Sequence, residues 1–347
     1  MTMSFASNAM SAKAKAMYGS RLKEADYQEL LHRKTVGEIA GYLKNETHYR
    51  EILAGINENG IHRGYLEFLI RQSFFLRFIQ LIRYGQTDKD HFYQYGIILI
   101  EIKQILLTIR SFNDSDRNTQ ISQMPLFASK YMSFDISKLV DVNNFSQLLD
   151  LLKPTIYYAA LKGISIQTDA DLDYTQCETA LKNLYFYKIN EIIEGEFTGK
   201  VKEQLQHIFA TQMELDNINK LYRLKKYFKV PPEQIKKLMN PVSSRISPSV
   251  MEHWIDHVPA DQLLTELSKS NYRQFIDKSR EFIYIEYHTE SIEYRLSRQM
   301  MRFASHPDII LVAYLVLMEV EVNNIVNIIE GIRYKVEPDK IAKMLIY

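Results

Sequence analysis

The feature that most constrains the fold is an internal repeat with a period near 110 residues. Residues 214–222 (ELDNINKLY) match 321–329 (EVNNIVNII), 107 positions later, and a tyrosine follows each glutamate after 13 positions. A weaker copy, 101–110 (EIKQILLTIR), lies 113 positions before the second copy. Helical solenoid repeats are only about 34 to 47 residues long. The longer period therefore predicts three small multi-helix domains on one chain.

Both ends of the repeated unit have the apolar spacing of helices. In the three copies of the closing segment, apolar residues recur at i, i+3, i+4 and i+7, as in an amphipathic helix. The units also open alike, each with an aligned leucine and tyrosine: Leu43 and Tyr49, Leu152 and Tyr157, Leu267 and Tyr272. The 347 residues include only 12 glycines and 9 prolines, about half of average usage. We therefore predict an all-α fold.

Two polar segments separate the copies. One spans 111–125, and the other, 240–249, holds two prolines and four serines, a composition typical of loops. We place the domains at 1–113, 114–242 and 243–347. Similar surfaces that repeat head to tail can close into a ring, so we expect pseudo-threefold symmetry and a central concavity.

Composition argues against several classes of protein. The 43 Lys and Arg residues nearly balance the 42 Asp and Glu residues, so no strong field attracts the chain to nucleic acid or anionic lipid. Cys177 is the only cysteine, which excludes an intrachain disulfide and fits a reducing compartment. Residues 1–12 lack the features of a signal peptide. The longest apolar run, 309–318, is shorter than the roughly 20 residues of a membrane-spanning helix and predicts a buried core helix.

No motif for catalysis is complete. Residues 195–201 (GEFTGKV) approach a phosphate-binding loop, but one residue is missing between the glycines and Val201 cannot bind magnesium. Residues 169–174 resemble the start of a calcium loop without its glycine and final glutamate, so helix capping explains them better. His253 and His257 lie one helical turn apart without an identifiable third ligand. We expect no catalytic residue, cofactor or metal.

The basic segment 223–229 (RLKKYFK) leaves a second function open. Lysines and arginines interleaved with aromatic residues suit RNA, but cations also stabilise the C-terminal end of a helix. We favour the helix end and keep a helical RNA-binding protein as the alternative. A third possibility is an enzyme whose site is assembled at a domain junction.

Three segments together resemble a known family. They are 8–22 (NAMSAKAKAMYGSRL), the thrice-used Glu-x-x-(Asn/Gln)-Ile helix, and the closing 321–333. Their order, the threefold spacing and the chain length resemble the C subunit family of V/A-type rotary ATPases, whose eukaryotic members are called d subunits. The first copy departs most from the pattern, with Gln104 in place of asparagine.

The resemblance implies a non-catalytic, funnel-shaped rotor adaptor made of three helical domains. It would lie on the cytoplasmic face of the membrane, without a membrane span of its own and without nucleic acid as a partner. There it would join the rotor ring of proteolipid subunits to the central shaft formed by subunits D and F. It would transmit torque for proton or sodium transport linked to ATP.

The residues that we single out for partner binding are Gln104, Arg110, Asn217, Arg223 and Asn324. In the functional interpretation they lie near the socket that receives the shaft. Asn217 and Asn324 also allow a structural interpretation, because a polar side chain at a buried helix face commonly bonds a neighbouring backbone. For the asparagines we favour the structural interpretation.

Overall fold

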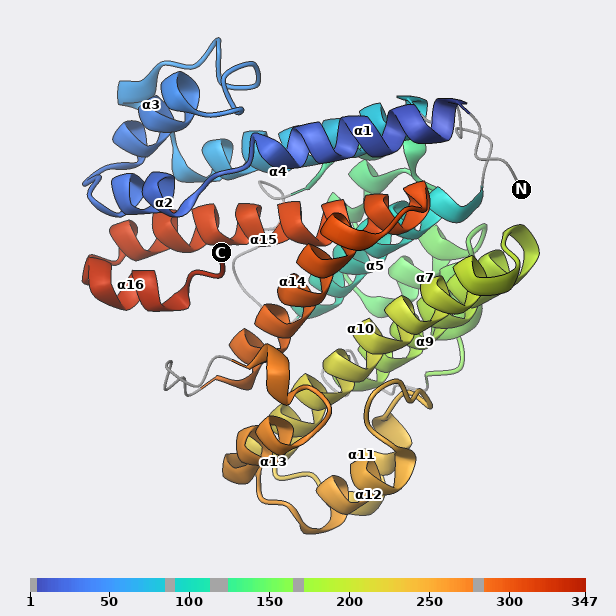
Figure 1. The fold of residues 1–347 in the computed structure, drawn as a ribbon. Helices are drawn as coiled ribbons and strands as arrows, with labels where there is room; N and C mark the ends of the chain where they lie inside the picture. The colour runs from blue at the N-terminus through green and yellow to red at the C-terminus, as the bar shows by residue number, and fades with distance from the viewer. Residues whose placement is uncertain (1–4, 85–90, 113–123, 165–171, 277–283) are drawn as a thin grey trace. The chain divides into compact units, whose positions relative to one another are not determined.

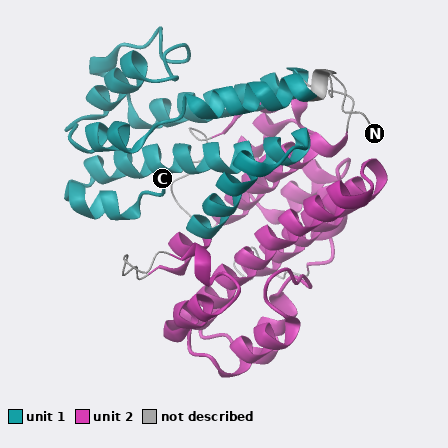
Figure 2. Cartoon of the chain, viewed as in Figure 1, with its two compact units in different colours: residues 1–89, 277–282, 290–347 teal, residues 90–276, 283–289 magenta. Residues whose placement is uncertain are grey.

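The computed structural model describes residues 5–84, 91–112, 124–164, 172–276 and 284–347, and within these ranges the chain forms helices and no strands (Figure 1). The predicted all-α fold is confirmed. The chain divides into two compact units (Figure 2). Unit 1 comprises Met1–Lys89, Asp277–Phe282 and Glu290–Tyr347, and unit 2 comprises Asp90–Ile276 and Ile283–Thr289. The predicted domain boundaries and the pseudo-threefold symmetry stay predictions.

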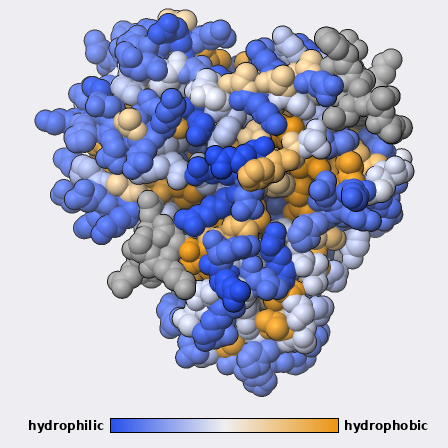
Figure 3. All heavy atoms as spheres, in the orientation of Figure 1, coloured by the Kyte–Doolittle hydropathy of each residue, from blue (hydrophilic) through white to orange (hydrophobic). Residues whose placement is uncertain are grey.

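Unit 1 is built from both ends of the chain. Its elements are α1 (Phe5–Gly19), α2 (Glu24–Leu31), α3 (Val36–Glu46), the short 3-10 helix η1 (Glu58–Gly60), α4 (Arg63–Tyr84), most of α14 (Ile285–Phe303), α15 (Pro307–Arg333) and α16 (Pro338–Met344). The long helices α1, α4 and α15 pack side by side (Figure 1). The surface over α2, α3 and α16 is largely hydrophilic (Figure 3), because the apolar residues of these helices face the core.

Unit 2 contains the middle of the chain. Its elements are η2 (His91–Tyr93), α5 (Gln94–Ser111), η3 (Leu126–Tyr131), η4 (Ile136–Val140), α7 (Phe145–Leu152), α8 (Ile156–Leu161), α9 (Tyr174–Glu196), α10 (Gly199–Lys226), α11 (Pro232–Leu238), α12 (Pro248–His257), η6 (Ala260–Gln262), α13 (Leu263–Lys269), η7 (Arg273–Phe275) and the start of α14. Helix α9 packs against both α5 and α10. Asp173 caps α9 by accepting hydrogen bonds from the backbone N–H groups of Thr175 and Gln176 at 2.8 and 3.3 Å, and residues 169–171 lie outside the described ranges.

In the described part of the chain, two helical segments, His91–Ser111 and Pro307–Arg333, are long and apolar enough to cross a membrane by length and composition. Their most apolar stretches are 61% and 72% buried inside the protein. A core helix of a water-soluble protein has the same length and composition, so this is weak evidence for a span. In α15 the run 309–318 is almost wholly buried, as predicted for a core helix.

Candidate functional site

The repeated glutamates define the first candidate feature. Glu101 on α5, Glu214 on α10 and Glu321 on α15 are 2%, 0% and 4% exposed. Each carboxylate accepts a hydrogen bond from one tyrosine hydroxyl. The donors are Tyr157 to Glu101 at 2.5 Å, Tyr272 to Glu214 at 2.7 Å and Tyr49 to Glu321 at 3.1 Å. Because a buried carboxylate is costly without partners, these bonds show what the recurring glutamate does.

Backbone N–H groups complete each carboxylate site. Glu101 accepts from the backbone of Ser133, and Glu321 accepts from that of Leu22 at 2.6 Å. Glu214 accepts from three successive backbone groups, those of Ser244, Arg245 and Ile246, at 2.7 to 3.2 Å. Each glutamate therefore holds one segment that begins at the N–H donor and ends at the tyrosine. We call these segments modules: 22–49, 133–157 and 244–272.

Each module ends in the same local bonding pattern. The hydroxyl residue two positions before the tyrosine accepts that tyrosine's backbone N–H and donates to the carbonyl of a buried leucine. In chain order the hydroxyls are Thr47, Thr155 and Ser270, and the leucines are Leu43, Leu152 and Leu267. The leucines and tyrosines are those aligned in the sequence. The three copies therefore share a hydrogen-bonding pattern as well as a sequence pattern.

Burial keeps two of the three phenols protonated. It raises the pKa of Tyr49, and the Glu321 carboxylate raises it further. Burial and the Glu101 carboxylate likewise raise the pKa of Tyr157. A protonated phenol remains a donor to its glutamate. We call Glu101, Glu214 and Glu321 fasteners, because each bonds a tyrosine and the backbone of its module.

Asn217 and Asn324 bond the backbone in the same way. The Nδ2 of Asn217 donates to the carbonyl of Asn240 at 2.9 Å, and its Oδ1 accepts from the same residue's N–H at 3.0 Å. Asn324 makes the matching pair with Ile346 at 2.7 and 3.0 Å. Both asparagines are almost fully buried. This geometry supports the structural interpretation, and partner binding by either residue stays a prediction.

The other predicted partner residues have different surroundings. Gln104 is 5% exposed on α5, whereas Arg110, at the end of the same helix, is exposed. Arg223 on α10 is partly exposed and belongs to a charged network shared with α9. Unit 2 thus holds four of the five predicted residues, and Arg110 and Arg223 are the two that reach solvent.

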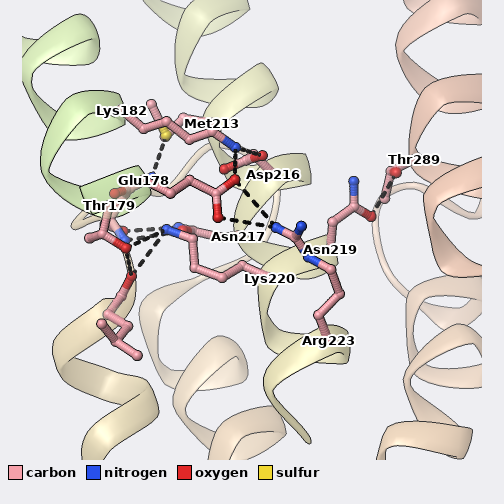
Figure 4. Close-up of polar contacts among 12 residues, drawn as sticks. Glu178, Thr179, Lys182, Met213, Asp216, Asn217, Asn219, Lys220, Arg223 and Thr289 are labelled. Carbon is pink, nitrogen blue, oxygen red and sulfur yellow. Dashed lines mark hydrogen bonds and ion pairs between the residues drawn. The ribbon is translucent and has the colours of Figure 1, made fainter. Parts of the chain in front are cut away.

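The charged network, called the α9–α10 cluster here, comprises Glu178, Lys182, Asp216, Lys220 and Arg223 (Figure 4). The Nζ of Lys182 lies 2.9 Å from Glu178 and 2.5 Å from Asp216. The Arg223 guanidinium lies 3.4 Å from Glu178. These four side chains alternate in sign across the two helices and neutralise one another.

Lys220 lies deeper and has only neutral oxygen acceptors. Its Nζ donates to the hydroxyl of Thr179 and to the carbonyl of Leu238, both at 3.2 Å. Burial lowers the pKa of Lys220 to about 8, although Asp216 opposes the shift. For Lys182, burial also lowers the pKa, but Asp216 and Glu178 outweigh it and the net pKa is raised. Lys182 therefore keeps its positive charge, whereas Lys220 loses its proton more readily.

The outer edge of the α9–α10 cluster suits binding better than catalysis. The side chain of Arg223 is 38% exposed, and those of Lys182 and Asp216 are 25% and 26% exposed. Arg223 bonds Glu178 at 3.5 and 3.4 Å, and its side chain is the most exposed of the three. The i,i+4 pair of Glu178 and Lys182 was the sequence signal that could have located this cluster.

The other sequence candidates have structural surroundings. Residues 195–201 span the end of α9, the two-residue connection 197–198 and the start of α10, with Gly199 at φ +57°. Burial raises the pKa of Cys177 to about 12, which disfavours a nucleophilic thiolate. His253 and His257 lie on α12 with ring centroids 5.3 Å apart. In the described part of the chain, no group of three or more His, Cys, Asp or Glu side chains could hold a metal ion.

A family model described as the ATP synthase (C/AC39) subunit matches residues 10–344. The search of the curated proteins found no match.

Proposed function

Since the chain belongs to the ATP synthase (C/AC39) subunit family, we propose that it is the non-catalytic rotor adaptor of a V/A-type ATPase. It joins the central shaft, formed by subunits D and F, to the proteolipid rotor ring on the cytoplasmic face of the membrane. Torque then passes through it between ion transport and the catalytic head. The observation that carries the proposal is the family match over nearly the whole chain.

The buried fasteners support a mechanical role. A part that transmits torque has to resist deformation, and closely packed interiors are stiff. Glu101, Glu214 and Glu321 each tie a module to a long helix through bonds to both backbone and tyrosine. Hydrogen bonds to charged groups are each worth about 1.5–3 kcal/mol. These ties resist separation of the modules from the long helices.

We assign the shaft contact in unit 2 to the exposed edge of the α9–α10 cluster. Arg223 is paired there with Glu178, and Asp216 lies about two helical turns before it on α10. The edge presents both signs of charge, which suits a polar, orientation-specific contact. Arg110, the other arginine of this unit that is predicted to bind a partner, is also exposed.

The basic segment 223–229 gives the RNA alternative little support. The Nζ of Lys225 donates to the carbonyls of Trp254 and Val258 at 2.7 and 2.5 Å. Lys226 forms an ion pair with Asp261. Three of its four basic side chains are therefore bonded within the protein: Lys225 to the end of α12, Lys226 to Asp261 and Arg223 to Glu178.

The test is affinity purification of the tagged chain from native membranes. We expect the shaft and ring subunits to co-purify, and Arg223→Glu to weaken recovery of the shaft by about tenfold while the ring is retained. Lys200→Glu, the same charge change at the exposed start of α10, is the matched control. Recovery of neither subunit, or of RNA whose binding falls steeply with salt, would refute the proposal.

A further inference from the structure

Glu321 differs from Glu101 and Glu214 in the order of glutamate and module along the chain. Module 133–157 follows Glu101 along the chain, and module 244–272 follows Glu214, so the tyrosines lie only 56 and 58 residues after their glutamates. Glu321 lies on the last long helix, and its module, 22–49, lies at the other end of the chain. Tyr49 and Glu321 are 272 residues apart. This contact joins the first and last parts of unit 1.

Among the described residues, only this fastener has an additional side-chain donor. His48 lies between Thr47 and Tyr49, and its Nε2 lies 2.7 Å from Oε1 of Glu321. Its side chain is 5% exposed. The residues at the matching position in the other modules are Ile156, which has no donor, and Asn271, which donates to the carbonyl of Arg245 at 2.8 Å.

The surroundings of Glu321 form a continuous apolar interface between the two ends of the chain. Ile39, Leu43 and Leu53 are fully buried in one core with Ile325, Ile328 and Ile329 of α15. The ring of Tyr27 stacks on that of Tyr347 with centroids 5.2 Å apart. Helix α16 approaches α15 so closely that a Cβ on Gly331 would clash with the side chain of Ile341. Module 22–49 and α16 therefore share the core along α15.

We propose that module 22–49 completes the third copy of the repeat from the opposite end of the chain, and that His48 is the clasp that secures it to Glu321. The other two modules follow their glutamates closely in the chain. The short connection limits the conformational entropy that a module gains when it separates from its glutamate. Module 22–49 lacks such a short connection. The bond from the imidazole to the buried carboxylate compensates, because bonds to charged groups are the stronger class.

The experiment is hydrogen exchange on the full-length protein, compared module by module. His48→Leu removes the donor and keeps an apolar side chain, and we expect exchange in 22–49 to accelerate about tenfold or more. Exchange in 133–157 and 244–272 should not change. His48→Gln keeps an N–H donor and should recover part of the protection.

Asn271→Leu is the matched control, because Asn271 occupies the position in module 244–272 that His48 occupies in module 22–49. This substitution should leave exchange in 244–272 nearly unchanged. Acceleration of all three modules by His48→Leu would indicate general destabilisation and overturn the clasp. Unchanged exchange in 22–49, or an equal effect of Asn271→Leu on its own module, would overturn it too. Protection equally lost in His48→Gln would show that the donor is not what matters.

Discussion

At the scale of single residues, Asn217 and Asn324 show how a repeat in sequence becomes a repeat in bonding. Each amide group joins its helix to the backbone 23 or 22 residues later, using both its donor and its acceptor. At 1% and 2% exposure, the two side chains are shielded from bulk solvent. The side chain thereby fixes where the chain lies after the helix ends.

Replacing either asparagine by alanine is expected to lower the free energy of unfolding by about 1–3 kcal/mol, because a buried N–H and a buried carbonyl lose their partners. Chemical denaturation measures this change. Asn323→Ala is the neighbouring control, since its bond to Glu290 at 3.1 Å is only partly buried, and it should cost less. Unchanged stability with weaker shaft binding would instead place these asparagines in the partner contact.

Lys220 makes a prediction about pH. Burial lowers the pKa of its ammonium from 10.5 to about 8, so the unfolded chain binds the additional proton between these values. Stability from this group therefore rises with pH from about 8 to 10.5, and the full penalty, about 3 kcal/mol, applies below pH 8.

Urea denaturation of wild type and Lys220→Met at pH 7, 8.5 and 10 measures this effect, because the other titrating groups are common to both proteins. We expect the stability of wild type relative to Lys220→Met to increase across the series. A difference that stays constant with pH would contradict the assignment.

Sequence reasoning found both partners of each fastener but not their contact. The glutamates aligned in one set, and Tyr49, Tyr157 and Tyr272 aligned in another. Whether members of the two sets meet depends on how the intervening stretch folds back, and helical periodicity holds no information on that. The α9–α10 cluster was missed for a different reason. Asp216 and Lys220 align with Asn323 and Asn327 in the last copy, so comparison of the copies could not reveal it.

At the scale of elements, the chain adopts the same unusual backbone conformation just after α10 and just after α15. Lys229 and Lys335 adopt the left-handed conformation, at φ 54° and 53°. After each of them the backbone N–H of Val230 or Val336 returns to a carbonyl of the helix, at 3.0 and 2.8 Å. The repeat in the sequence places these two lysines at nearly the same distance after Glu214 and Glu321, 15 and 14 residues. It did not predict their conformation, because glycine is the usual residue there.

Replacing either lysine by glycine is expected to stabilise the protein by about 1 kcal/mol, since glycine has no Cβ to strain the left-handed conformation. Thermal or chemical denaturation measures the gain. Gln204→Gly, at an exposed position inside α10, should destabilise by about the same amount. A loss of stability in Lys229→Gly and Lys335→Gly would mean that the lysine side chains contribute more than the strain removes.

Long helices were the most predictable elements. The apolar stripes around Glu214 and Glu321 lie on α10 and α15, and the run 309–318 is part of a core helix, as expected. Of the short helices, α8 is capped by Thr155, which accepts from the backbone N–H of Tyr157, whereas α13 has no side-chain N-cap and places Leu263 and Leu267 in the core. Their lengths therefore could not be derived from periodicity alone.

At the scale of the whole molecule, the predicted boundaries of the sequence copies differ from the boundaries of the compact units. The predicted divisions near 113 and 242 mark where the repeat begins again. Compactness depends on which segments share a core, and unit 1 joins 1–89 to 290–347. The Glu321 fastener explains the difference, because the last long helix binds a module from the first copy.

The proposed coupling of the shaft to the ring by this chain can be measured as ion transport. Its most direct test is ATP-driven ion uptake by membrane vesicles from cells that lack the chain, before and after the purified protein is added back. We expect uptake to be lost without the chain and restored with it, while the catalytic head hydrolyses ATP in both cases. Full uptake without the chain would show that it does not couple the shaft to the ring.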